Sequence, residues 1–159
     1  MTKIWENNID KFIKFSNQFG VKMLMVGGGA VNFHGYLRHS ADVDFWIDVT
    51  PENMKNLVTV FNKMGYEIDS FPQKVLDKQQ NISIKFSPVD INLELITNFS
   101  VSKSFDDALR DSVEVVIKGE TFLKWRVLNL DDLITSKIKA GRAKDLLDIQ
   151  ELKQINKID

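Results

Sequence analysis

Residues 27–48 combine two kinds of residue that could together handle phosphate groups. Three consecutive glycines at 27–29 follow an apolar run, and Asp42 and Asp44 appear further along the chain. Glycine lets backbone N–H groups approach a phosphate closely. A carboxylate pair can hold the metal ion that accompanies a nucleoside triphosphate. The combination favours phosphoryl or nucleotidyl transfer over other chemistry.

The glycine run alone has two interpretations. A strand followed by glycines and a helix N-terminus would gather unpaired N–H donors, which suits phosphate binding. The run is not Gly-x-Gly-x-x-Gly, because position 32 is Asn, and it lacks the Gly-Lys-Ser/Thr ending of a P-loop. A tight strand-to-helix turn without a ligand is the simpler explanation of the glycines by themselves.

The acidic residues also have two interpretations. In an extended strand Asp42 and Asp44 point to one face, about 6–7 Å apart. Their repulsion is on the order of 2–3 kcal/mol at an effective dielectric constant near 20, so in a cleft they need a cation such as Mg²⁺. On a solvated strand they would form an ordinary acidic face. Asp90 or Glu94 could supply the further carboxylate that two-metal transfer requires, if their strand is a neighbour of the first.

The elements that must position these residues alternate between strands and helices. Apolar periodicity predicts helices over residues 4–19, 30–37, 51–64, 105–110, 131–140 and 143–155, with a glycine turn at 27–29. It predicts strands over 22–26, 43–49, 82–86, 89–96, 113–117 and 121–127, the last two as a hairpin, and leaves 66–80 unassigned. Thr50 is the expected N-cap of the helix that begins at Pro51. We expect one domain over residues 1–159, a mixed sheet with helices.

Composition excludes several classes of protein. The chain has no cysteine, which rules out disulfides, zinc–thiolate sites and cysteine nucleophiles. Two histidines, His34 and His39, make a multi-histidine metal site unexpected. A net charge of -1 argues against strong indiscriminate nucleic-acid binding. With no signal-peptide pattern and no apolar run of roughly 18 residues, we expect a cytoplasmic protein with no membrane contact.

Residues 27–44 resemble the signature of the nucleotidyltransferase superfamily, Gly-Gly-x-Ala-x-x-x-His-Gly-x-x-Arg-x-Ser/Thr-x-Asp-h-Asp, where h is apolar. The matching residues are Gly27, Gly28, Ala30, His34, Gly35, Arg38, Ser40, Asp42 and Asp44. The similarity extends over roughly residues 20–155, since 93–97, 105–108 and 141–149 resemble elements of a small bacterial branch. That branch includes the toxins of type IV abortive-infection pairs.

The resemblance implies an α+β, minimal nucleotidyltransferase (polymerase-beta-like) fold, with a mixed curved sheet, flanking helices and two C-terminal helices. It implies that Asp42 and Asp44 bind two Mg²⁺ ions, with Mn²⁺ as an alternative. It makes Glu94, rather than Asp90, the third carboxylate of the metal site and of catalysis.

The resemblance also implies a binding site for a nucleoside triphosphate. Gly27, Gly28 and Gly29 would line it, with Gly28 and Gly29 at the β- and γ-phosphates. Arg38 would meet a phosphate or pair with an aspartate. Lys137 belongs to a basic cluster with Arg142 and Lys144, which either approaches the triphosphate or acceptor or forms a solvated face.

Three further residues have structural interpretations. We expect His34 to be a buried, hydrogen-bonded histidine beside the cleft. Asp145 and Asp148 lie three residues apart on one helix, and we expect them to tie the C-terminal helices together or to pair with Arg142 rather than to bind metal.

The function implied is metal-dependent transfer of a nucleoside monophosphate to a hydroxyl acceptor. The acceptor would be a tRNA 3′ end, a small molecule or a protein, and a toxin paired with an antitoxin protein is one such enzyme. Gly29 stands where many superfamily members have serine, and Glu94 where they have aspartate. These departures leave open an alternative, a catalytically degenerate module that senses a nucleotide or binds a partner in a two-protein system.

Overall fold

The structure is a computed structural model that describes residues 7–86, 91–119 and 122–159. Within these ranges the strands are β1 (Met23–Val26), β2 (Asp42–Ile47), β3 (Ile82–Ile84), β4 (Asn92–Ile96), β5 (Val113–Ile117) and β6 (Leu123–Val127). The helices in the same ranges are α1 (Asn7–Gln18), α2 (Gly27–Phe33), α3 (Pro51–Lys63), α4 (Gln73–Leu76), α5 (Phe105–Arg110), α6 (Leu130–Ala140) and α7 (Ala143–Ile155). The predicted mixed α+β class is confirmed, as are the two helices near the C-terminus.

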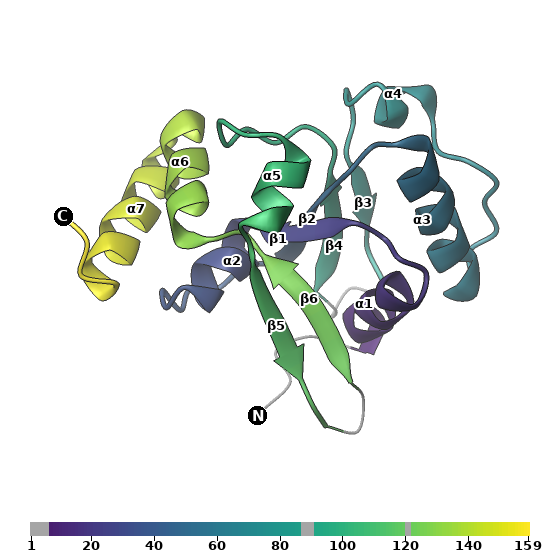
Figure 1. Cartoon of the computed structure of the whole chain (residues 1–159), viewed down its shortest axis with the longest axis horizontal. Coiled ribbons are helices and arrows are strands. Elements are labelled where there is room, and N and C mark those ends of the chain that lie inside the picture. The colour runs from purple at the N-terminus through teal and green to yellow at the C-terminus, as the bar shows by residue number, and fades with distance from the viewer. Residues whose placement is uncertain (1–6, 87–90, 120–121) are drawn as a thin grey trace.

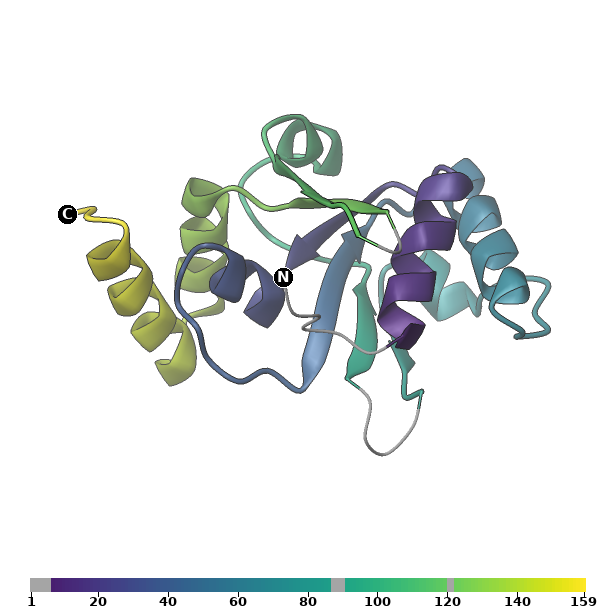
Figure 2. The ribbon, with the colours of Figure 1, turned by 90° about the horizontal axis from the view of Figure 1, so that it is seen from below.

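All six described strands form one mixed sheet in the order β3-β4-β2-β1-β6-β5. The central strand β2 runs antiparallel to β1 and parallel to β4, and β1 runs parallel to β6. The β5–β6 pair is the predicted hairpin, and β3 runs antiparallel to β4 at the other edge. Helices α6 and α7 lie at one end of the molecule and α3 and α4 at the other, with the sheet between them (Figure 1, Figure 2).

One face of the sheet forms the apolar core with α1 and α3. The ring of Phe12 on α1 lies 6.0 Å from that of Phe45 on β2 and 5.8 Å from that of Phe61 on α3. Ile9 and Ile13, on the same side of α1 as Phe12, are fully buried. This face therefore accounts for the apolar periodicity of the two helices.

The opposite face of β2 carries two acidic residues and a tryptophan. Because alternate strand residues point to opposite faces, Asp42, Asp44 and Trp46 share the face that Phe45 does not. Trp46 packs edge-on against Phe105 of α5, with ring centroids 5.0 Å apart. The acidic residues of β2 lie next to this contact, outside the apolar core.

Side-chain caps explain why several helices begin where the sequence predicts. Thr50 accepts a hydrogen bond from the N–H of Asn53 at the start of α3, and Pro51 is the first helical residue. Ser104 caps α5 and Asn129 caps α6 in the same way. Gly141, with φ of 64°, adopts the left-handed conformation that ends α6.

The prediction around the glycines is wrong in its details. Helix α2 begins at Gly27 itself, with no intervening turn, and ends at Phe33 rather than near residue 37. Gly27 has φ of 61°, a conformation open to glycine that lets the chain pass directly from β1 into a helix. The unassigned region 66–80 contains α4, a helix too short to leave a periodic signal. The candidate carboxylate Asp90 lies outside the described residues.

None of the helices in the described ranges is long and apolar enough to cross a membrane.

The Thr50 cap provides a test of the fold. We expect Thr50→Ala to lower the free energy of unfolding by about 1 kcal/mol, because the first turn of α3 loses its capping oxygen. Thr59→Ala, at a half-buried position within the same helix, is the matched control and should be neutral or slightly stabilising, because alanine has the higher helix propensity. Urea denaturation measures both, and equal effects of the two substitutions would contradict the capping role.

Candidate active site

Parallel pairing of β2 with β4 brings three carboxylates together. Asp44 is directly opposite Glu94 in the register, and Asp42 is opposite Asn92. Side chains opposite each other on neighbouring strands point to the same face, about 5 Å apart at the backbone. All three acidic residues are half-buried and line a cavity of about 640 Å³. They therefore do not form the fully solvated acidic face that the sequence also allowed.

Burial, together with the neighbouring carboxylates, raises the pKa of Asp44 to about 6. Burial is the largest cause, and the neighbouring charges of Asp42 and Glu94 add to it. The positive charges of Lys137 and Lys144 act in the opposite direction but do not cancel the effect. The site is thus short of positive charge around Asp44.

Two of the glycines are required by close packing at this cavity. A Cβ at Gly27 would collide with the carboxylate of Asp44, and one at Gly28 would lie 2.7 Å from the Cβ of Ser40. Both glycines line the cavity. The surroundings of Gly29 differ, because a Cβ there would lie 2.9 Å from the sulfur of Met25. Gly29 lines a second pocket, which adjoins the first at Ser40 and Asp42.

The carboxylates are suited to a hard divalent cation that arrives with its own oxygen ligands. Among the described residues, no three acidic, histidine or cysteine side chains are grouped closely enough to hold an ion by themselves. The side chain of Glu94 accepts a hydrogen bond from the Ser83 hydroxyl at 2.5 Å. In phosphoryl-transfer sites Mg²⁺ takes one or two carboxylates and completes its shell with phosphate oxygens and water. The side chains of Asp42, Asp44 and Glu94 offer carboxylate oxygens, the type of ligand that such an ion takes.

A buried charge network forms the wall of the cavity opposite the sheet. Lys137 is only 7% exposed, and its Nζ lies 2.9 Å from Asp148 and 3.3 Å from Asp145. Arg38 binds both oxygens of Asp148, through Nε at 2.8 Å and Nη2 at 3.0 Å. Arg142 donates from Nε to Asp145 at 2.6 Å. Three cations around two carboxylates leave a net positive charge beside the glycines, which suits a polyphosphate.

The two aspartates of α7 stay ionised within this network. Burial would raise the pKa of Asp145, but hydrogen bonds from Arg142 and the charge of Lys137 outweigh it, and the pKa lies below its usual value. Burial acts on Asp148 in the same sense, and hydrogen bonds from Arg38 and Lys137 lower its pKa further than burial raises it. As expected from the sequence, both aspartates link helices and pair with basic residues. Arg38 pairs with Asp148 and still lines the cavity.

The hydrogen bond predicted for His34 is confirmed, but the side chain is half-buried rather than buried and does not line the cavity. Its Nε2 lies 2.7 Å from the carbonyl oxygen of Leu128, and the ring is half-buried. Burial lowers its pKa, an effect only partly offset by that hydrogen bond. A neutral imidazole that donates from Nε2 therefore joins the end of α2 to the chain before α6.

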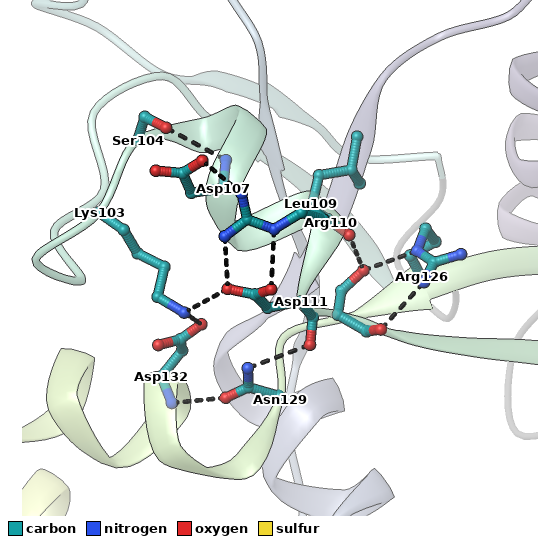
Figure 3. A network of polar contacts seen from close by, with 10 residues as sticks. Lys103, Ser104, Asp107, Leu109, Arg110, Asp111, Arg126, Asn129 and Asp132 are labelled. Atoms are coloured by element: carbon teal, nitrogen blue, oxygen red, sulfur yellow. Dashed lines mark hydrogen bonds and ion pairs between the residues drawn. The ribbon is translucent and has the colours of Figure 1, made fainter.

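A second polar network fixes the start of α6, the helix that carries Lys137 (Figure 3). Lys103 lies 2.9 Å from the carboxylates of both Asp111 and Asp132. Asn129 caps α6 and also donates to the carbonyl oxygen of Asp111 at 3.1 Å. Hydrogen bonds from Arg110 and Lys103 lower the pKa of Asp111 to about 2. The segment after β4 and the start of α6 are thereby tied together.

Sequence reasoning missed several residues that line the cavity. Ser40, Ser136, Ile96 and Phe99 all border it. Ile96 has the same strand parity as Glu94, so it could have been assigned to this face. Phe99 lies in the segment after β4 and carries no periodic signal.

Comparison with known families agrees with this geometry. Residues 7–159 match the family DUF6036, described as a nucleotidyltransferase of unknown function. The chain belongs to this family. The match includes every residue of the carboxylate group and of the charge network, and it confirms the resemblance to the nucleotidyltransferase superfamily. The mixed α+β architecture is compatible with such a fold. No curated protein matches the sequence.

The raised pKa of Asp44 makes stability depend on pH. A pKa raised in the folded state contributes stability that is complete below the unfolded value near 4 and lost as pH rises through about 6. We therefore expect Asp44→Asn to be more stable than the wild type at pH 7.5, by about 1–3 kcal/mol. The difference should shrink towards pH 4.5, where Asp44 is protonated.

Urea denaturation across this pH range measures the difference. Asp69→Asn, an exposed aspartate remote from the cavity, should follow the wild type at every pH. A constant offset between Asp44→Asn and the wild type would show that the carboxylates do not interact as described.

The charge network makes a separate prediction about stability. Asp148→Asn should lower the free energy of unfolding by about 3–5 kcal/mol, because Arg38 and Lys137 lose their shared buried counter-charge. Arg38→Gln and the double variant complete a thermodynamic cycle. We expect a coupling energy above about 0.5 kcal/mol, and strictly additive effects would rule out a direct Arg38–Asp148 interaction.

Proposed function

We propose that the protein transfers a nucleoside monophosphate from a nucleoside triphosphate to a hydroxyl acceptor, with release of pyrophosphate. The observation that carries the proposal is the meeting of Asp42, Asp44 and Glu94 in one cavity with the first two glycines and the basic network. Membership of a nucleotidyltransferase family supports it. We further propose that the fold is the minimal, polymerase-beta-like version of the nucleotidyltransferase fold.

The three carboxylates would hold two Mg²⁺ ions, or Mn²⁺ in their place. When bound, these ions would neutralise phosphate charge and acidify the acceptor hydroxyl. The pKa of Asp44 supports this assignment, because its neighbours disfavour ionisation until a cation compensates them.

The chain's own residues position the donor and move one proton. Gly27 and Gly28 let the phosphates approach the backbone closely, and Arg38 and Lys137 offset the charge of the β- and γ-phosphates. The acceptor oxygen forms a bond to the α-phosphorus while the bond from that phosphorus to the bridging β-phosphate oxygen breaks. Glu94 accepts the proton of the acceptor hydroxyl, and pyrophosphate leaves with the electron pair of the broken bond.

A basic rim beside the cavity favours an RNA acceptor. Lys139, Arg142 and Lys144 are all exposed, and the last two line the cavity. We propose the 3′ end of a tRNA as the acceptor, with a small molecule or a protein hydroxyl as the alternatives. Modification of a tRNA 3′ end would make the protein a toxin, and an antitoxin protein would then be its partner. Binding of tRNA through this rim should weaken steeply as salt concentration rises.

A nucleotide-sensing or partner-binding module is the second candidate function. The observations in its favour are that the described acidic side chains do not group around one point and that Glu94 is hydrogen-bonded to Ser83. Such a module would bind a nucleotide, or a partner, without magnesium and without transfer.

A donor triphosphate labelled at either its α- or its γ-phosphate tests the transfer reaction. With magnesium and total tRNA, we expect α-phosphate-labelled triphosphate to label the acceptor and γ-labelled triphosphate not to, because the α-phosphorus is the atom transferred. Asp42→Asn should reduce labelling by at least roughly 100-fold, since loss of a metal ligand costs more than the 10–100-fold of an outer partner.

Asp69→Asn again serves as the control and should retain full transfer. Calorimetry with each of the four nucleoside triphosphates, with and without magnesium, gives a readout that needs no acceptor. Magnesium-independent nucleotide binding that Asp42→Asn leaves intact would favour the sensing module. Full transfer by Asp42→Asn would overturn the assignment of the site.

A further inference from the structure

An aromatic cluster lies on the same sheet face as the carboxylates, one step further along the strands. Trp46 follows Asp44 by two residues and Ile96 follows Glu94 by two, so each pair shares a face. Trp46 and Ile96 are opposite each other in the β2–β4 register. The ring of Phe99 lies 5.3 Å from that of Trp46. Along these two strands, the acidic side chains are therefore followed on the same face by apolar and aromatic side chains.

Phe99 is the member of this cluster that reaches the cavity. Trp46 and Phe105 are buried, with 6% and 8% of their surface exposed, and they pack edge-on against each other. Phe99 is half-buried and lines the cavity together with Ile96. Of the described residues that line this cavity, Phe99 alone carries a phenyl ring. Its ring contacts the buried indole of Trp46 at an interplanar angle of 44°, and this contact limits its freedom to move.

The phosphate-binding groups lie in the opposite direction along the strands. Arg38 and Ser40 precede Asp42 in the chain, whereas Trp46 follows Asp44. Gly28 packs against Ser40, so the glycines lie at that same end.

A donor triphosphate bound in this cavity would lie along the strands, with its phosphates at the glycine end and its nucleoside at the aromatic end. With its α-phosphate at the carboxylates and its β- and γ-phosphates at the glycine end, its nucleoside extends towards Ile96 and Phe99. Ile96 lies two residue steps beyond Glu94, about 7 Å along the strand, a length that a ribose can span.

We propose that Phe99 is the stacking surface for the nucleobase of the donor triphosphate. The inference rests on the proposed function and adds a specificity-determining residue to it. A phenyl face stacks on any base, and it holds larger ring systems more strongly, so we expect purine triphosphates to bind better than pyrimidine triphosphates. Substitutions at Phe99 should reduce this difference.

Calorimetry with two probes tests the proposal. ATP and inorganic tripolyphosphate are titrated, with magnesium, into the wild type, Phe99→Ala, Phe99→Leu and Phe99→Tyr. Phe99→Ala and Phe99→Leu should weaken ATP binding by about fivefold or more and leave tripolyphosphate affinity unchanged, because only ATP carries a base. Phe99→Tyr, which keeps the aromatic face, should restore ATP binding. Phe99→Leu retains apolar volume and separates loss of stacking from loss of folding.

Phe71 provides the matched control. It is also half-buried, packs at 6.0 Å against Phe61, and lies outside the cavity, so Phe71→Leu should leave both affinities unchanged. Unchanged ATP affinity in Phe99→Leu, or an equal loss for ATP and tripolyphosphate, would overturn the stacking role and leave the proposed transfer reaction standing. Absence of magnesium-dependent ATP binding in the wild type would overturn the proposed function itself.

Discussion

The burial of Asp44 beside two other carboxylates, Asp42 and Glu94, is the constraint on which the rest of the site depends. Parallel pairing of β2 with β4 fixes Asp44 and Glu94 side by side, and strand parity adds Asp42 on the same face. No side-chain rotation moves a charge to the other face of a sheet, so the backbone itself enforces the crowding. A fold selected for stability alone would place neutral residues here. The retained electrostatic cost is the kind of perturbation that accompanies catalytic sites.

The basic side chains on the other side of the cavity are held in place by buried aspartates of α7. Helix α7 buries Asp145 and Asp148 and exposes Leu146 and Leu147, the reverse of the usual pattern for a surface helix. The buried aspartates hold Lys137 at the cavity wall, and a buried ammonium needs such partners to remain charged. The acidic residues of α7 thus position cations, whereas Asp42, Asp44 and Glu94 form no ion pair with any residue in the described ranges.

Local chemistry explains which elements the sequence could predict. Thr50, Ser104 and Asn129 each mark a helix start through a capping side chain, and β6 of the β5–β6 hairpin alternates regularly between apolar and basic residues. The start of α2 was mispredicted because a positive φ at Gly27 replaces the expected turn.

Pairings between distant segments leave no local signal. The register of Asp44 with Glu94 spans fifty residues of chain, and the contact of Arg38 with Asp148 joins residues 110 positions apart. The parity of each strand could be read from the sequence, but the partner of each strand could not. The resemblance to a family supplied the choice of Glu94 as third carboxylate, and the observed register is compatible with that choice.

The geometry at Gly29 bears on whether the glycine at this position signals a degenerate enzyme. Met25 and Val26 are successive residues of β1 and therefore point to opposite faces of the sheet. Val26 lines the cavity, and a side chain at Gly29 would press on the sulfur of Met25. A serine hydroxyl built there would start on the side of Met25, which is buried in the core. Packing against Met25 is thus a reason for glycine at this position that is independent of any phosphate ligand.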